Sequence, residues 1–256
     1  MKKNNAFQII LLALIIGLSI ACIAAFVMLC VRGADPTILI HKEKPKQESQ
    51  SPYELEETFD YGDGYLKSII FIGDKTIRPI ADAIPSLSPD QVWTGADGTL
   101  QLDYAISSAS IMINGEPIPI ESALEQYSPK YVIITVGIEN GVNHCTEEKF
   151  KEYYQRLVNT VKDASPETDI ILQSIFPVSK SAEKNDPSIS NSRIDNANSY
   201  IRSIAENLSV RYLNTAEILK NGEGYLDTKY DSGDGIILNQ DGYLAVENYI
   251  RTHGYK

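Results

Sequence analysis

Short apolar runs, each bounded by glycine, proline or polar residues, recur along the chain. Four of them are rich in Ile, Val and Leu and lie at residues 68–73, 131–137, 169–176 and 210–213. Runs of this length fit strands whose two faces are both covered. Three longer stretches place apolar side chains three or four residues apart, at 146–164, 194–208 and 241–252. This spacing predicts amphipathic helices, and the alternation of strands with helices predicts an α/β fold with a parallel sheet covered on both faces.

Weaker signals lie between these elements. Residues 76–83 and 121–127 are expected to form short helices. Asn114-Gly115 stands between two apolar runs, which predicts a β-hairpin. Thr146 precedes the first long helical pattern and is a suitable N-terminal cap.

The first part of the chain has a different pattern. Residues 6–31 carry no charged side chain and are long enough to span a bilayer, which needs about 20 apolar residues. A cleaved signal peptide has a shorter apolar core, so we expect an uncleaved anchor, although Ser19-Ile20-Ala21-Cys22 weakly resembles a lipoprotein processing site. The predicted organisation is a cytoplasmic N-terminus at 1–5, a transmembrane signal anchor at 6–31, a flexible linker at 32–58 and a folded domain at 59–256. Basic residues flank the span on both sides, so charge alone leaves its orientation open.

The net charge, the cysteine content and the spacing of possible metal ligands argue against several kinds of protein and site. The net charge of −11 argues against a nucleic-acid-binding protein, because phosphate contacts need clustered Lys and Arg. Of three cysteines only Cys145 follows the anchor, so no disulfide can form within the folded domain. His, Cys, Asp and Glu residues show no metal-ligand spacing, and we expect neither a metal nor a cofactor.

A family resemblance begins where the first apolar run ends. Phe71-Ile72-Gly73-Asp74 resembles the first block of the SGNH/GDSL hydrolases, whose pattern is Gly-Asp-Ser. Residues 171–178 and 234–243 are similar to segments of the bacterial branch of that family. The resemblance extends over 59–253 and implies an SGNH-hydrolase-like (flavodoxin-like) three-layer fold with a parallel sheet, here preceded by one N-terminal transmembrane helix.

The catalytic blocks of that family are altered in this chain. An active member attacks an ester with its serine, uses a histidine as general base and stabilises the oxyanion with backbone amides and an asparagine. Lys75 replaces the serine, and Glu139 takes the place of the asparagine. Asp234 is retained, whereas Ile237 takes the place of the histidine. The family's glycine block would fall near 104–107, which contain no glycine. The resemblance therefore implies a site that lacks the catalytic nucleophile and base.

Residues that follow the strands should meet at the carboxyl edge of the sheet. Two interpretations of Lys75 remain open there. It pairs with Glu139 or Asp234, because an unpaired buried cation is costly, or it binds an anionic ligand. The candidates for ligand binding are Asp74, Lys75, Glu139, Asn140 and Asp234.

These observations support three hypotheses about function. The first is a catalytically inactive SGNH/GDSL hydrolase-like protein, anchored in the cell membrane with its domain outside the cytoplasm, that binds a cell-envelope glycan or an envelope protein. Trp93, Tyr104 and Tyr243 would be aromatic contacts in its cleft, although each is also typical of a core. The alternative is an active ester hydrolase of envelope carbohydrate, with a rebuilt site in which Thr76 is the nucleophile and His144 the base. The third is a structural envelope component whose old pocket is filled by the Lys75 pair.

Overall fold

The computed structural model describes residues 51–103 and 111–254. The folded domain begins at residue 51. The predicted cytoplasmic N-terminus, the predicted anchor at 6–31 and most of the predicted linker lie outside the described residues. Within 51–103 and 111–254, no helix is long and apolar enough to cross a membrane.

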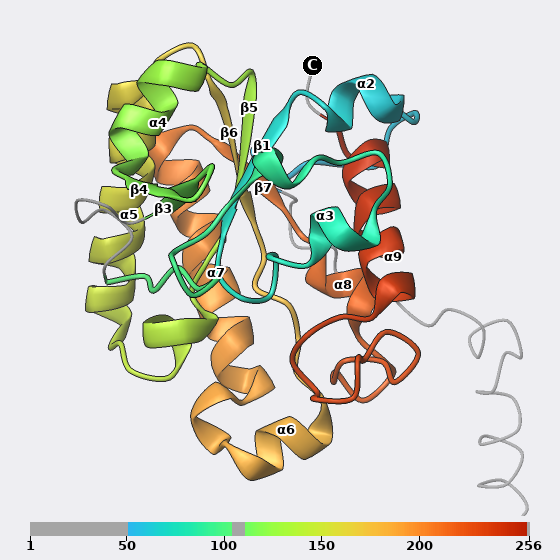
Figure 1. The fold of residues 1–256 in the computed structure, drawn as a ribbon. Coiled ribbons are helices and arrows are strands. Elements are labelled where there is room, and N and C mark those ends of the chain that lie inside the picture. Colours follow the sequence, from blue (N-terminus) through green and yellow to red (C-terminus); the bar gives the residue numbers. More distant parts are fainter. Residues whose placement is uncertain (1–50, 104–110, 255–256) are drawn as a thin grey trace, which may run out of the picture. The chain divides into compact units, whose positions relative to one another are not determined.

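Five parallel strands form the central sheet (Figure 1). In chain order they are β1 (Ile69–Gly73), β2 (Val92–Trp93), β5 (Tyr131–Thr135), β6 (Asp169–Gln173) and β7 (Arg211–Leu213). Their spatial order is β2-β1-β5-β6-β7, and every neighbouring pair is parallel. This is the flavodoxin-like strand order, so the predicted α/β fold class is confirmed.

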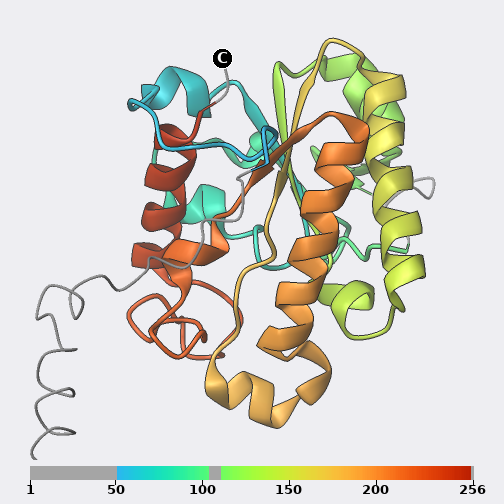
Figure 2. The same ribbon diagram turned by 180° about the vertical axis from the view of Figure 1, so that it is seen from behind.

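Helices cover both faces of the sheet (Figures 1 and 2). One layer contains α4 (Ile120–Tyr127), α5 (Glu147–Ala164) and α7 (Asn191–Leu208). The other contains α2 (Gly62–Leu66), α3 (Ile80–Ala83), α8 (Ala216–Leu219) and α9 (Gln240–Thr252). Each layer buries its own apolar cluster against the sheet, because all residues of β5 are buried and successive side chains of a strand point to opposite faces.

Shorter elements connect the strands and helices. β3 (Ile111–Ile113) and β4 (Glu116–Ile118) form the predicted antiparallel hairpin. Asn114 and Gly115 at its turn have positive φ angles of 54° and 82°, as this type of turn requires. The remaining short elements are η1 (Pro89–Gln91), η2 (Ile138–Val142), α6 (Lys180–Asn185) and η3 (Pro187–Ile189).

The prediction of a flexible linker up to residue 58 is wrong for its last eight residues. We call residues 51–58 the strap, because they belong to the compact domain: Glu54 and its neighbours lie along β7, and Thr58 N donates to Thr252 O at the end of α9. Tyr212 N donates to Tyr53 O, and Leu55 N donates to Tyr212 O, each at 2.9 Å.

Side chains fasten the strap as well. The Glu54 carboxylate lies 3.4 Å from the Arg202 guanidinium, and its side chain is 9% exposed. Arg211 Nη1 also donates to Pro52 O at 2.8 Å. The ordered structure of the strap could not be predicted from its polar composition. The strap is held by backbone hydrogen bonds and ion pairs, and these leave no pattern of apolar residues in the sequence.

Candidate functional site

The strand order places the candidate site between β1 and β5. Within the sheet, β2 lies next to β1 on one side, and β5 lies next to β1 on the other side. The strand order therefore reverses direction at β1. In open α/β sheets, ligands bind at the carboxyl ends of the strands at such a switch point. β1 ends at Gly73 and β5 at Thr135, so the site is built from the residues that follow these two positions.

Asp74 joins the two strand ends from within the protein. Its Oδ2 accepts hydrogen bonds from Gly137 N at 3.1 Å and Ile138 N at 3.2 Å. Its Oδ1 accepts from Thr76 N at 3.0 Å and from Thr76 Oγ1 at 2.6 Å. Burial raises the pKa of Asp74 to about 6, although these donors favour the carboxylate and oppose the rise. With 1% of Asp74 exposed, the carboxylate acts as a clamp between β1 and η2 and not as a surface for a ligand.

Glycine allows the strand ends to approach this closely. A Cβ on Gly73 would lie 2.9 Å from Thr135 O and closer still to the side chain of Ile77. Gly137 has a φ of 126°, a conformation that other residues rarely adopt. The two glycines therefore let the backbone turn sharply into the site.

Lys75 and Glu139 form an ion pair across the switch point. Lys75 Nζ lies 3.2 Å from Glu139 Oε1, and the two side chains are 38% and 22% exposed. Lys75 therefore has Glu139 as its partner, one of the two that the sequence predicts. Within the described ranges no ion pair joins Lys75 to Asp234. The position that the family resemblance assigns to the nucleophile is thus held by a cation engaged with a carboxylate.

Asp234 and Ile237 lie in the loop before α9. Asp234 Oδ1 accepts from Ile236 N and Ile237 N, both at 2.8 Å, and from Ser232 Oγ at 3.3 Å. The carboxylate is exposed and stabilises its own turn. Ile237 is partly buried against the apolar cluster of the α9 layer, and its aliphatic side chain cannot accept a proton.

Asn140 faces the segment before the undescribed residues. Its Nδ2 donates to Gln101 Oε1 at 2.8 Å and lies 3.4 Å from Asp103 Oδ1. Its φ is 51°, which marks the kink within η2. Of the five predicted ligand-binding residues, the structure thus brings Lys75 and Glu139 into contact, buries Asp74 and engages Asn140 and Asp234 elsewhere.

The geometry does not support the rebuilt pair of Thr76 and His144. Thr76 is 2% exposed, and its hydroxyl donates to Asp74. His144 is exposed, and no hydrogen bond joins it to Thr76 in the described part of the chain. Trp93 and Tyr243 are each 1% exposed and are core residues, while Tyr104 lies outside the described residues.

Asp186 and Arg193 are parts of the site region that sequence reasoning missed. Hydrogen bonds from Ser188 lower the pKa of Asp186, and the charges of His144 and Lys75 lower it further, so Asp186 lies within electrostatic range of both residues. No local sequence pattern marks this residue, because its approach depends on how α6 and η3 fold back toward η2.

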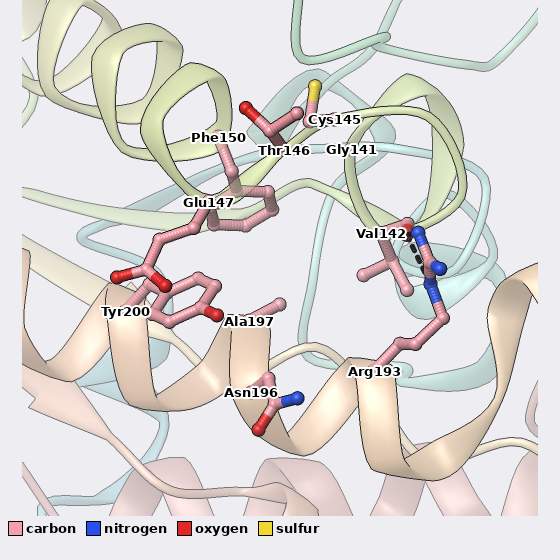
Figure 3. A pocket seen from close by; sticks show the side chains of 10 residues that line it. All are labelled: Gly141, Val142, Cys145, Thr146, Glu147, Phe150, Arg193, Asn196, Ala197 and Tyr200. Carbon is pink, nitrogen blue, oxygen red and sulfur yellow. Dashed lines mark hydrogen bonds between the residues drawn. The ribbon is translucent and has the colours of Figure 1, made fainter.

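Arg193 holds the end of η2 from α7. Its Nε and Nη2 donate to Val142 O at 3.0 Å and 2.8 Å, as Figure 3 shows. The same side chain lines a pocket of about 170 Å³ together with Cys145, Phe150 and Tyr200. This pocket lies between the η2–α5 connection and α7, so Arg193 fixes the segment that carries Glu139.

A series of buried, hydrogen-bonded side chains connects the strand ends next to the site. Thr135 Oγ1 donates to Gln173 Oε1 at 2.6 Å, and Gln173 Nε2 donates to Thr215 Oγ1 at 2.7 Å. All three side chains are buried. The carboxyl ends of β5, β6 and β7 are therefore tied together. In the described ranges, no three His, Cys, Asp or Glu residues are grouped so that they could hold a metal ion.

Comparison with known proteins agrees with this architecture. A GDSL-like lipase from Bacteroides thetaiotaomicron is similar at a TM-score of 0.51, with 16% sequence identity over 71% of this chain and 84% of that chain. A protein from Bacteroides fragilis described as an acylhydrolase gives a TM-score of 0.52 and 17% identity, over 77% of this chain and 88% of that chain. Identities this low support the fold alone. No curated protein matches the sequence.

The sequence itself matches a protein family. The match to the GDSL-like Lipase/Acylhydrolase family covers residues 80–245, which is more than half of the chain. It begins just after Lys75 and includes Glu139, Asp234 and Ile237. The matched segment, together with the flavodoxin-like sheet, shows that this chain belongs to the GDSL-like lipase/acylhydrolase family.

Proposed function

We propose that this chain is a family member that binds a ligand at the switch point between β1 and β5 without hydrolysing it. The observation that carries the proposal is the ion pair between Lys75 Nζ and Glu139 Oε1, at 3.2 Å. A protonated amine held by a carboxylate is no nucleophile, and the negative charge of Glu139 would repel an oxyanion. Ile237 supplies no base in place of the histidine.

The proposed ligand is a glycan of the cell envelope or an envelope protein, and the proposed location is the outer side of the cell membrane. Residues 6–31 support an anchor by their length and their lack of charge. Fractionation of cells that express the full chain tests this part. Recovery with the membranes, resistant to high salt, is expected, and recovery in the soluble fraction would contradict the anchor.

An ester hydrolase of envelope carbohydrate is the second candidate, because the family consists of lipases and acylhydrolases. Such an enzyme would need a nucleophile other than the one at position 75. Losing the nucleophile and base of a triad leaves at most a factor of about 10³ to 10⁴ over water, from binding and oxyanion donors.

The full-length protein can decide between these candidates in an assay for acetate release from a chromogenic acetyl ester. We expect no turnover above the rate in buffer. We also expect little or none from a Lys75→Ser, Ile237→His variant, because Glu139 still occupies the oxyanion side. Enzyme-like turnover that Thr76→Ala or His144→Ala removes would establish the hydrolase instead.

A further inference from the structure

The pocket of about 170 Å³ beside α7 is separate from the switch point, since neither Lys75 nor Glu139 lines it (Figure 3). Its walls come from the end of η2, the start of α5 and one face of α7. Gly141 in η2 and Ala197 in α7 contribute little side-chain volume, so a hollow remains between the two elements. A molecule in this hollow would contact residues that have no part in the Lys75 pair.

The size of the pocket matches one six-membered ring. A protein cavity of about 150 Å³ can hold benzene. A volume of about 170 Å³ therefore has room for a ring of that size with small substituents. Phe150 and Tyr200 give the pocket an aromatic wall, in which the two ring centroids lie 6.1 Å apart and the ring planes are inclined by 60°. Such a wall packs against the flat face of a bound ring.

Polar groups line the rest of the pocket and are available to a ligand. Arg193 donates through Nε and Nη2 to Val142 O, and its Nη1 forms no hydrogen bond within the described residues. In the same ranges the side-chain amide of Asn196 has no partner, and both Arg193 and Asn196 are exposed. The guanidinium offers donors, the amide offers donors and an acceptor, and the Glu147 carboxylate offers acceptors. Hydroxyl groups suit this mixture, because each one can both donate and accept.

The charges that line the pocket cancel. They are the guanidinium of Arg193 and the carboxylate of Glu147, and Glu147 Oε1 also lies 2.5 Å from Lys151 Nζ. An anion drawn to Arg193 would be repelled by Glu147, and a cation drawn to Glu147 would be repelled by Arg193 and Lys151. A ring without polar substituents would remove water from these groups and give them no partner in return.

We infer that this pocket binds a single uncharged six-membered ring that carries several hydroxyl groups. Both a sugar in its pyranose form and a cyclitol have this chemistry. The inference concerns a second site and goes beyond the function proposed for the switch point.

The methyl group of Ala197 lines the pocket, so its NMR signal reports occupancy. The full-length protein, isotope-labelled in its alanine methyl groups, is titrated with methyl β-glucoside, myo-inositol, cyclohexanol and glucuronate. We expect at least one of the two uncharged hydroxylated rings to shift the Ala197 signal, with half-saturation on the order of 1–10 mM. Cyclohexanol, with a single hydroxyl, and glucuronate, with a carboxylate, should need about ten-fold more. The signal of Ala216 in α8 should stay in place. Tighter binding of the glucoside or of the inositol identifies the ligand as a sugar or a cyclitol.

Asn196→Leu and Asn207→Leu form a matched pair, because both residues are exposed on α7 and, of the two, only Asn196 lines the pocket. Asn196→Leu should raise the half-saturation concentration several-fold, whereas Asn207→Leu should leave it unchanged. The inference is overturned if neither hydroxylated ring gives a saturable shift of the Ala197 signal, if cyclohexanol or glucuronate binds equally well, or if the two variants behave alike. Each of these outcomes leaves the proposed function of the switch point standing, because no residue of the pocket belongs to the Lys75–Glu139 pair.

Discussion

Asp74 and Lys75 are neighbours in the chain, yet their surroundings at the switch point differ completely. Asp74 is buried and accepts hydrogen bonds from three backbone amides and one hydroxyl. Lys75 is 38% exposed and forms an ion pair with Glu139 Oε1. The other oxygen of that carboxylate, Oε2, has no hydrogen-bond partner among the described residues. The first residue joins the end of β1 to η2. The second lies just beyond the end of β1, where its contact with Glu139 is a partly exposed ion pair.

Removing the Asp74 carboxylate should have the largest effect. Asp74→Ala leaves the amides of Thr76, Gly137 and Ile138 buried without an acceptor, at about 1–3 kcal/mol for each group. We expect a loss of about 4 kcal/mol in the free energy of unfolding, measured by urea denaturation. Asp234→Ala is the matched control, since it removes an exposed carboxylate that also accepts from backbone amides. A similar loss of unfolding free energy in both variants would contradict the conclusion that Asp74 holds two elements together, whereas Asp234 stabilises only its own loop.

The pH dependence of stability should show the next largest effect. The pKa of Asp74 is raised to about 6 in the folded domain from 3.8, so the folded state binds the proton more tightly. The stability from this group is therefore fully present below about pH 4 and is lost as the pH rises through 6. Wild type should lose about 2–3 kcal/mol relative to Asp74→Asn between pH 4 and pH 7. A gain over the same range would mean that the hydrogen bonds outweigh burial.

Loosening η2 from α7 should be milder. Arg193→Met removes two charged hydrogen bonds to Val142 O but keeps most of the aliphatic stem. We expect a loss of about 1–2 kcal/mol in unfolding free energy, together with faster hydrogen exchange of the amides of η2. Unchanged exchange in η2 would show that Arg193 does not hold this segment.

The Lys75 pair itself should contribute least to stability. Lys75→Met removes a partly exposed ion pair, for which a loss of about 0.5 kcal/mol or less is expected. Thermal unfolding of this variant and of the wild type provides the measurement. A loss comparable to that of Asp74→Ala would place Lys75 in the architecture and would weaken the case for a binding role.

The sequence predicts those parts of the molecule that depend on local pattern. The strands at β1, β5 and β6 are continuous apolar runs, and Thr146 accepts from Lys149 N at 3.4 Å as the expected cap of α5. β2 is two residues long and has no such pattern, so it could not be predicted. The strap was missed because its order comes from pairing with β7.

Part of the site could also be predicted, because it depends on local sequence pattern. Strand ends are readable from sequence, so the meeting of Lys75 with Glu139 could be expected. The role of Asp234 could not, since the carboxylate bonds to the amides of its own turn instead of reaching across the site. Asp186 and Arg193 depend on the approach of α6, η3 and α7, which no local spacing encodes.

The strap has a consequence for how this protein behaves outside its native setting. β7 is an edge strand, and an uncovered edge is a template on which another chain can add a strand and aggregate. Tyr53 and Leu55 occupy the backbone groups of Tyr212 that such a chain would use. A truncated protein that begins at residue 59 would expose this edge, whereas one that begins at residue 51 would keep it covered. The start of the domain, far in sequence from β7, thereby governs its resistance to aggregation.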